Sequence, residues 1–155
     1  MAALNPLRRW QYRLLYATLA LLVVSGVAWL AVHYLWGAGA DQLPHPLEPW
    51  LMRLHGAAGF AALFMAGLLA CVHVPQGWRM VTRIPHLRER WASQRRTGLA
   101  LCALGGACVA SSYLLYYFAP ENLRPALGWA HAATGLALAA LLPLHEKSAP
   151  HLRDG

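Results

Sequence analysis

The sequence predicts an all-α integral membrane protein, a four-helix bundle with both termini in the cytoplasm. The chain of 155 residues is 58% hydrophobic and only 12% charged, whereas soluble domains are roughly 25% charged. Four long segments carry almost no charge, and each is near the roughly 20 residues that a helix needs to cross a bilayer. No other segment is long enough for a soluble domain, so we expect a single domain covering residues 1–155.

The predicted spans cover about residues 13–37, 50–74, 96–119 and 125–146. The first span resembles a secretion signal, because basic residues precede an apolar run. That run is much longer than the roughly 7–15 apolar residues of a signal peptide, so we expect an anchor that is retained.

Positive charge lies mostly on one side of this four-span arrangement. Eleven of the thirteen basic residues precede the first span, separate the second and third spans or follow the fourth: Arg8, Arg9, Arg13, Arg79, Arg83, Arg88, Arg90, Arg95, Arg96, Lys147 and Arg153. This asymmetry predicts that these segments face the cytoplasm of a multi-pass protein, which we place in a bacterial inner membrane. The net charge of +7 then indicates contact with anionic lipid headgroups and not with nucleic acid.

Two hydrophobic spans each contain two histidines. His55 and His73 belong to the second span, and His131 and His145 belong to the fourth. These spans run in the same direction, so His55 and His131 lie near the outer face, and His73 and His145 near the inner face. Residues 18 apart share a face of an α-helix, and residues 14 apart deviate by about 40°. Because imidazole is costly in hydrocarbon, the four histidines predict a functional site, namely bis-histidine ligation of haem b.

Small residues follow the two outer histidines in a weak internal repeat. Gly59 and Gly135 are each four residues beyond a histidine, one helical turn further on the same face. A flat macrocycle packed against a helix requires such a surface, so we predict that both glycines contact haem. The alternative is close helix–helix packing through small residues.

Two arginines oppose the charge asymmetry. Arg53 and Arg124 are predicted at the outer face, beside the spans that carry His55 and His131. We predict that they pair with haem propionates, because a guanidinium binds carboxylates in a bidentate manner. Contact with lipid headgroups is the alternative.

The remaining candidate residues are assigned more simply. His33, near the outer end of the first span, is interpreted as an interfacial anchor, with an outer haem ligand or a quinone pocket as alternatives. The chain has no Cys-x-x-Cys-His motif, which excludes covalent haem attachment to it. Its three cysteines are interpreted as small apolar residues without chemistry.

With these histidines and glycines, the chain resembles the small di-haem cytochromes b of bacterial membranes. These four-helix proteins are related to the haem-bearing membrane subunits of formate dehydrogenase and nickel hydrogenase. The resemblance implies electron transfer between quinone and a separate redox partner, such as a c-type cytochrome or a dehydrogenase subunit, without bond-making chemistry in this chain. Two features depart from the family: the first span lacks an inner histidine, and the histidines of the second span are 18 residues apart.

Three questions stay open at this stage. The histidines are separated by about 27 Å along the second span but by about 21 Å along the fourth, so the chain holds either one haem or two. A small transporter of metal ions or protons is the alternative function, although no Asp or Glu lies in the middle of a span. A structural anchor, in which the histidines bond only across helices, is the third interpretation.

Overall fold

The computed structural model describes residues 9–83 and 91–148, and every regular element in these ranges is helical. Within them, four segments are long and apolar enough to cross a membrane: Arg9–Ala40, Glu48–Arg79, Ala92–Tyr117 and Arg124–Lys147. The all-helical class and the four predicted segments are therefore confirmed. Of the basic residues used to predict orientation, Arg8, Arg88, Arg90 and Arg153 lie outside the described residues.

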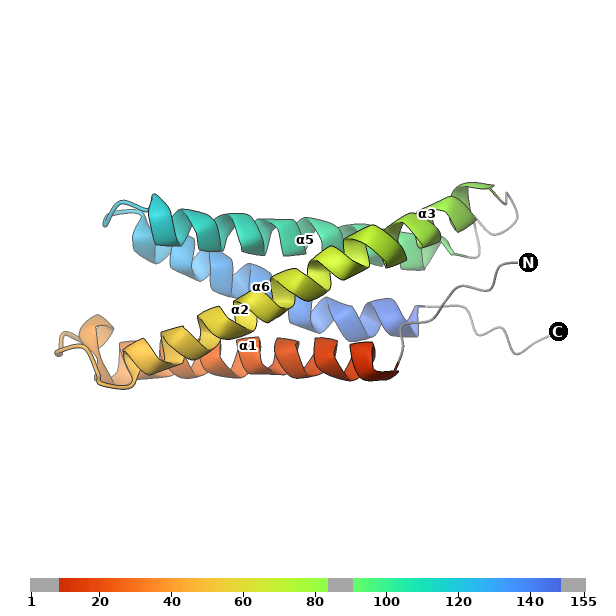
Figure 1. Cartoon of the computed structure of the whole chain (residues 1–155). Coiled ribbons are helices and arrows are strands. Elements are labelled where there is room, and N and C mark those ends of the chain that lie inside the picture. Colours follow the sequence, from red (N-terminus) through yellow and green to blue (C-terminus); the bar gives the residue numbers. More distant parts are fainter. Residues whose placement is uncertain (1–8, 84–90, 149–155) are drawn as a thin grey trace. The chain divides into compact units, whose positions relative to one another are not determined.

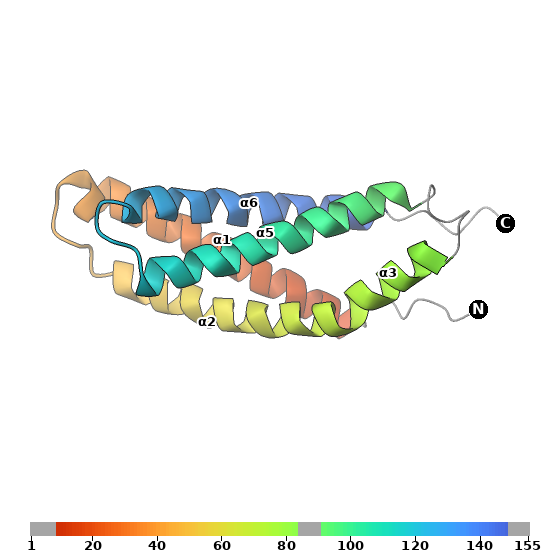
Figure 2. The same ribbon diagram turned by 90° about the horizontal axis from the view of Figure 1, so that it is seen from above.

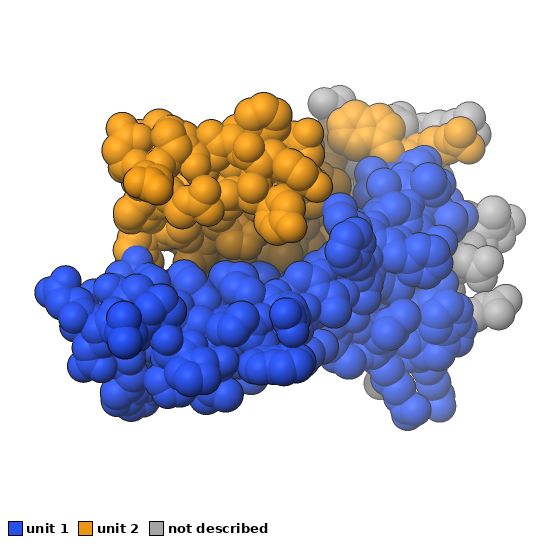
Figure 3. Space-filling model, turned by 60° about the vertical axis from the view of Figure 1, so that its left-hand side comes forward, with its two compact units in different colours: residues 1–77 blue, residues 78–155 orange. Residues whose placement is uncertain are grey.

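The chain divides into two compact units, Met1–Gly77 and Trp78–Gly155, which Figure 3 shows in different colours. Each unit contains two of the four long apolar segments. That all 155 residues form one domain stays a prediction.

The first unit is built on an antiparallel helical hairpin (Figure 1). Its elements are α1 (Arg9–Trp36), η1 (Ala38–Ala40), α2 (Glu48–Leu68), η2 (Leu69–His73) and the beginning of α3 (Val74–Arg83). The turn includes Asp41, whose φ of 57° lies in the left-handed region. At the start of α2, Pro49 occupies the first turn, where its missing N–H leaves no hydrogen bond unmade.

The long helical segment that contains α2 is not a continuous α-helix. η2 is a single π-helical turn that ends at His73, and Pro75 follows two residues later. Proline removes a backbone donor and disturbs the preceding turn, which is a common setting for such a distortion. A π turn holds more residues than an α turn. The continuous α-helix that would align His55 with His73 is therefore interrupted.

The second unit contains α5 (Ala92–Tyr117) and α6 (Arg124–Lys147), which pack as another antiparallel hairpin (Figure 2). Arg124 closes the turn by donating to the carbonyl oxygens of Ala119 at 3.1 Å and Leu115 at 3.4 Å. Carbonyls at the end of a helix lack partners within the helix, so a guanidinium stabilises them. α6 continues through Pro143 to Lys147 without a break.

Large apolar side chains on both hairpins are exposed. Examples are Phe60, at 78%, and Phe64, at 65%, on α2, and Leu99, at 66%, on α5. Exposed apolar area on this scale indicates contact with a membrane or a partner. Polar groups, in contrast, are buried where helices of one hairpin meet, and Ser25 is only 1% exposed.

Candidate functional site

His55 binds the neighbouring helix of its own hairpin through one ring nitrogen. Its Nδ1 atom lies 3.0 Å from Oγ of Ser25 and 3.1 Å from the carbonyl oxygen of Leu22, both on α1. Ser25 Oγ in turn donates to the carbonyl oxygen of Leu21 at 2.6 Å. The imidazole, the hydroxyl and the backbone carbonyls therefore form one hydrogen-bonded group inside the hairpin.

These contacts determine the tautomer of His55. A carbonyl oxygen only accepts hydrogen bonds, and the proton of Ser25 is already directed at a carbonyl. Nδ1 must therefore carry the ring proton, and the neutral ring has its lone pair on Nε2. This is the form in which an imidazole coordinates a metal through Nε2 while its other nitrogen fixes the orientation of the ring.

The second hairpin repeats the arrangement twice. Nδ1 of His131 lies 2.9 Å from Oγ of Ser111, and Nδ1 of His145 lies 2.8 Å from Oγ1 of Thr97. Both hydroxyls donate within their own helix, Ser111 to the carbonyl of Cys108 and Thr97 to that of Gln94, each at 3.1 Å. Each hydroxyl can serve as donor or acceptor, and its bond within its own helix leaves the oxygen able to accept a proton from Nδ1.

Two of the three hydroxyl residues are followed by a glycine that faces the histidine ring. A Cβ atom built on Gly26 would lie 3.1 Å from Cε1 of His55, and one built on Gly98 would lie 3.2 Å from Cε1 of His145. These distances are tighter than ordinary van der Waals contacts, so a larger residue would displace the ring. Both glycines face the ring of a histidine on the other helix of the same hairpin. In the structure, their open side accommodates the histidine.

Helix register explains why these hydroxyls and histidines meet. Facing residues of an antiparallel hairpin are equally far from its turn, and both pairs of the second unit are centred on Glu121. Sequence reasoning missed Ser25, Thr97 and Ser111. The available signal was that Thr97 and Ser111 are fourteen residues apart, as are His131 and His145.

His73 has a different environment from the other three histidines. It is exposed and ends the π turn. The pair Ser25–His55 is centred on Ala40, so the position opposite His73 is residue 7, which lies outside the described residues. His73 is 18 residues after His55, so the position opposite it precedes Arg9, the described start of α1.

The glycines and arginines that were predicted for the site differ in their contacts. Within the described part of the chain, no heavy atom other than its own helix backbone and chain neighbours lies within 4 Å of a Cβ built on Gly59. A Cβ on Gly135 would contact Sγ of Cys108 at 3.9 Å. Arg53 lies over the ring of Trp50, 4.8 Å from its centroid, and Arg124 binds the end of α5. Their proposed role with propionates stays a prediction.

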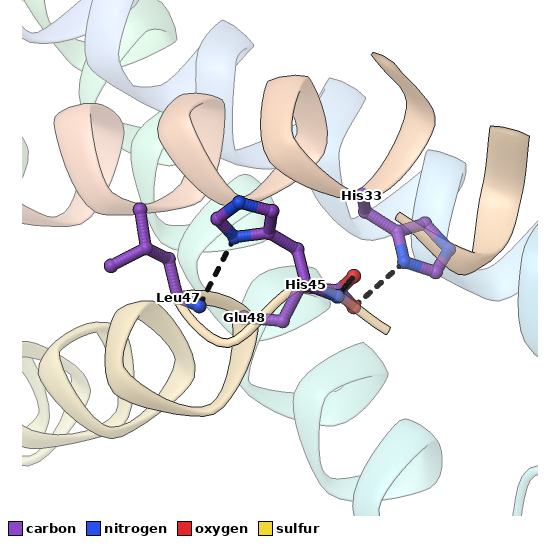
Figure 4. Close-up of polar contacts among 4 residues, drawn as sticks. All are labelled: His33, His45, Leu47 and Glu48. Carbon is purple, nitrogen blue, oxygen red and sulfur yellow. Dashed lines mark hydrogen bonds and ion pairs between the residues drawn. The ribbon is translucent and has the colours of Figure 1, made fainter. Parts of the chain in front are cut away.

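His33 makes a hydrogen bond to a carboxylate that the sequence did not predict. Its Nδ1 atom lies 2.9 Å from Oε2 of Glu48, across the turn of the first hairpin (Figure 4). No group of three or more His, Cys, Asp or Glu residues that could hold a metal ion is assembled within residues 9–83 and 91–148.

Comparison with protein-family models, with curated proteins and with solved structures finds no match to this chain.

Proposed function

We propose that this chain is a membrane-spanning b-type cytochrome that transfers electrons. Its axial ligands would be His55, His131, His73 and His145, holding one haem or two. The observation that carries the proposal is a contact shared by three of these residues, whose Nδ1 atoms each lie within 3.0 Å of a hydroxyl oxygen on the neighbouring helix. Assignment of His55 and His131 to one haem rests on their equal predicted depth in the sequence.

The residues fit this cofactor in donor type and in support. A b-type haem is held by side chains alone, and imidazole is a common axial ligand. A ligating histidine almost always donates its other ring N–H to an oxygen acceptor, which fixes the ring and tunes the metal. Ser25, Ser111 and Thr97 place a hydroxyl oxygen within 3.0 Å of Nδ1 and would supply those acceptors. Gly59 and Gly135 keep the surface beside two of the ligands free of larger side chains.

Each part of the chain has a defined task in this proposal. When bound, a haem with two imidazole ligands supplies reversible one-electron chemistry without an open coordination position. The histidines hold the iron, the hydroxyls orient the histidines, and Arg53 and Arg124 pair with the propionates. Four apolar helices hold the site in the bilayer of a bacterial inner membrane, with both termini in the cytoplasm.

The partners follow from this placement. A lipid-soluble quinone is the natural electron donor or acceptor within the bilayer. A separate protein, either a c-type cytochrome or a dehydrogenase subunit, exchanges electrons at the membrane surface. The resemblance to small di-haem cytochromes b supports the same assignment.

The absorption spectrum of the purified protein tests the proposal. A dithionite-reduced sample should show the α-band of a b-type haem, and extraction with alkaline pyridine should yield one or two non-covalently bound haems per chain. A colourless protein that retains a transition-metal ion would contradict the proposal and favour the transport alternative.

A further inference from the structure

The turn of the first hairpin contains a second polar group, built around a mostly buried carboxylate. The Glu48 side chain is 11% exposed and that of His33 is 22% exposed. Oε2 of Glu48 accepts from Nδ1 of His33, and Oε1 accepts from the backbone N–H of His45, each at 2.9 Å (Figure 4). One carboxylate thus joins the end of α1 to the start of α2.

Close packing fixes this pair in place. The indole of Trp29 stacks on the His33 ring with centroids 4.6 Å apart and an angle of 11°, and Tyr34 meets the ring edge-on at 4.8 Å. Gly37 leaves room for the carboxylate, because a Cβ built there would collide with Oε1 of Glu48. The imidazole therefore has a single defined orientation.

The hydrogen bond to Glu48 orients the imidazole of His33 so that it can act as a base. A carboxylate that accepts the Nδ1 proton leaves the lone pair of a neutral imidazole on Nε2. Among the described residues, none hydrogen-bonds to Nε2 of His33. An imidazole oriented by a carboxylate is suited to accept a hydrogen bond, or a proton, from a hydroxyl group.

The surroundings identify the class of hydroxyl compound. The pair lies at the end of a membrane hairpin, and the neighbouring residues Leu35 and Trp36 expose 60% and 57% of their surface. A ligand that reaches such a position through lipid must be apolar apart from its hydroxyl groups. A hydroquinone with a hydrocarbon tail combines these properties.

We propose that His33 and Glu48 form the headgroup site for a quinol, with Nε2 of His33 accepting a hydrogen bond from a phenolic hydroxyl. Glu48 fixes the orientation of the imidazole. The inference rests on the proposed function for its choice of substrate class, because electron transfer within a bilayer requires a lipid-soluble redox partner. It goes further by giving that partner a location, at the turn between α1 and α2.

Binding of a short-chain benzoquinol to the detergent-solubilised full chain, measured by calorimetry without oxygen, tests this site. His33→Ala should weaken binding about ten- to hundredfold, because it removes a hydrogen bond to the ligand. Glu48→Gln should weaken it less, because an amide still meets Nδ1. His45→Ala is the matched control, since the backbone N–H that binds Glu48 remains and binding should not change.

A second measurement does not depend on variants. Bound benzoquinol should protect His33 of the wild-type chain from a histidine-modifying reagent, detected by mass spectrometry, while His45 stays reactive. Equal binding by His33→Ala and wild type, or modification of His33 at an unchanged rate, would overturn the inference. A chain that holds haem without binding quinol refutes this site alone, whereas a haem-free chain that binds quinol refutes the proposed function and leaves the site intact.

Discussion

At the scale of single residues, the most informative feature is the contact between Nδ1 of three histidines and a hydroxyl on the neighbouring helix. The sequence predicted His55, His131 and His145 from their cost in hydrocarbon, but it did not predict the hydroxyls that bind them. Serine and threonine inside a helix usually bond to carbonyls of the preceding turn, and Ser111 does so here. The composition of the span therefore gave no sign of a second partner. Only the helix register shows that the hydroxyl also meets an imidazole.

We predict that Ser111→Ala raises the midpoint potential of the haem held by His131 by about 20–60 mV, the equivalent of one neutral hydrogen bond. A hydroxyl that accepts from Nδ1 makes the imidazole a stronger ligand and stabilises ferric iron. Potentiometric titration of the α-band measures the shift. Ser112→Ala is the control, because Ser112 is exposed and its hydroxyl donates to the carbonyl of Val109. A shift of equal size in both variants would argue against a role through His131.

The contacts of Arg124 also could not be predicted from the sequence. Arg124 was predicted to pair with propionates or lipid headgroups, because only its charge and predicted side of the membrane were considered. The structure adds an interaction with the carbonyls of Leu115 and Ala119. These acceptors exist because α5 ends nearby, which a count of charges along the chain does not reveal.

At the scale of elements, each hairpin brings a glycine against a histidine ring. A hydroxyl residue and a glycine in sequence, Ser25–Gly26 and Thr97–Gly98, provide both an acceptor and the space for the imidazole. Glycines within the predicted spans indicated close packing of a neighbouring group. In the structure, the group that packs against these two glycines is the imidazole of a histidine. The sequence alone did not distinguish a glycine that faces a histidine from one that faces open space.

Gly98→Ala should displace His145 and lower the free energy of unfolding by about 1–3 kcal/mol relative to Gly106→Ala, the usual cost of an extra methyl group in a packed contact. Gly106→Ala is the matched control on the same helix, because no heavy atom beyond its own helix and chain neighbours in the described residues lies within 4 Å of its added Cβ. Thermal unfolding in detergent, followed by circular dichroism, measures both variants. Equal stability of the two would show that the ring of His145 moves aside without cost.

The π turn at η2 is a feature that the hydropathy of the sequence does not predict. Apolar composition placed all four helices within a few residues of their observed ends, since burial in lipid depends on composition averaged over a whole span. The distortion before Pro75 depends instead on individual hydrogen bonds, which such an average does not resolve. The predicted same-face relation of His55 and His73 assumed a regular helix.

At the scale of the whole molecule, the prediction of four apolar helices is confirmed, and the chain forms two hairpins of similar design. Each hairpin places at least one imidazole against a hydroxyl of its neighbouring helix. Charge asymmetry determines the predicted orientation, and part of that charge lies outside the described residues.

The central proposal, based on the predicted depth of the two histidines in the sequence, is that His55 and His131 ligate the same iron. Haem content per chain should therefore be measured by pyridine extraction for His55→Ala, His131→Ala and the double variant, with His45→Ala as the control. We predict that both single variants lose the same haem and that the double variant loses no more, because removing either ligand already empties one shared site. Full haem content in His131→Ala, or losses that add in the double variant, would contradict the account.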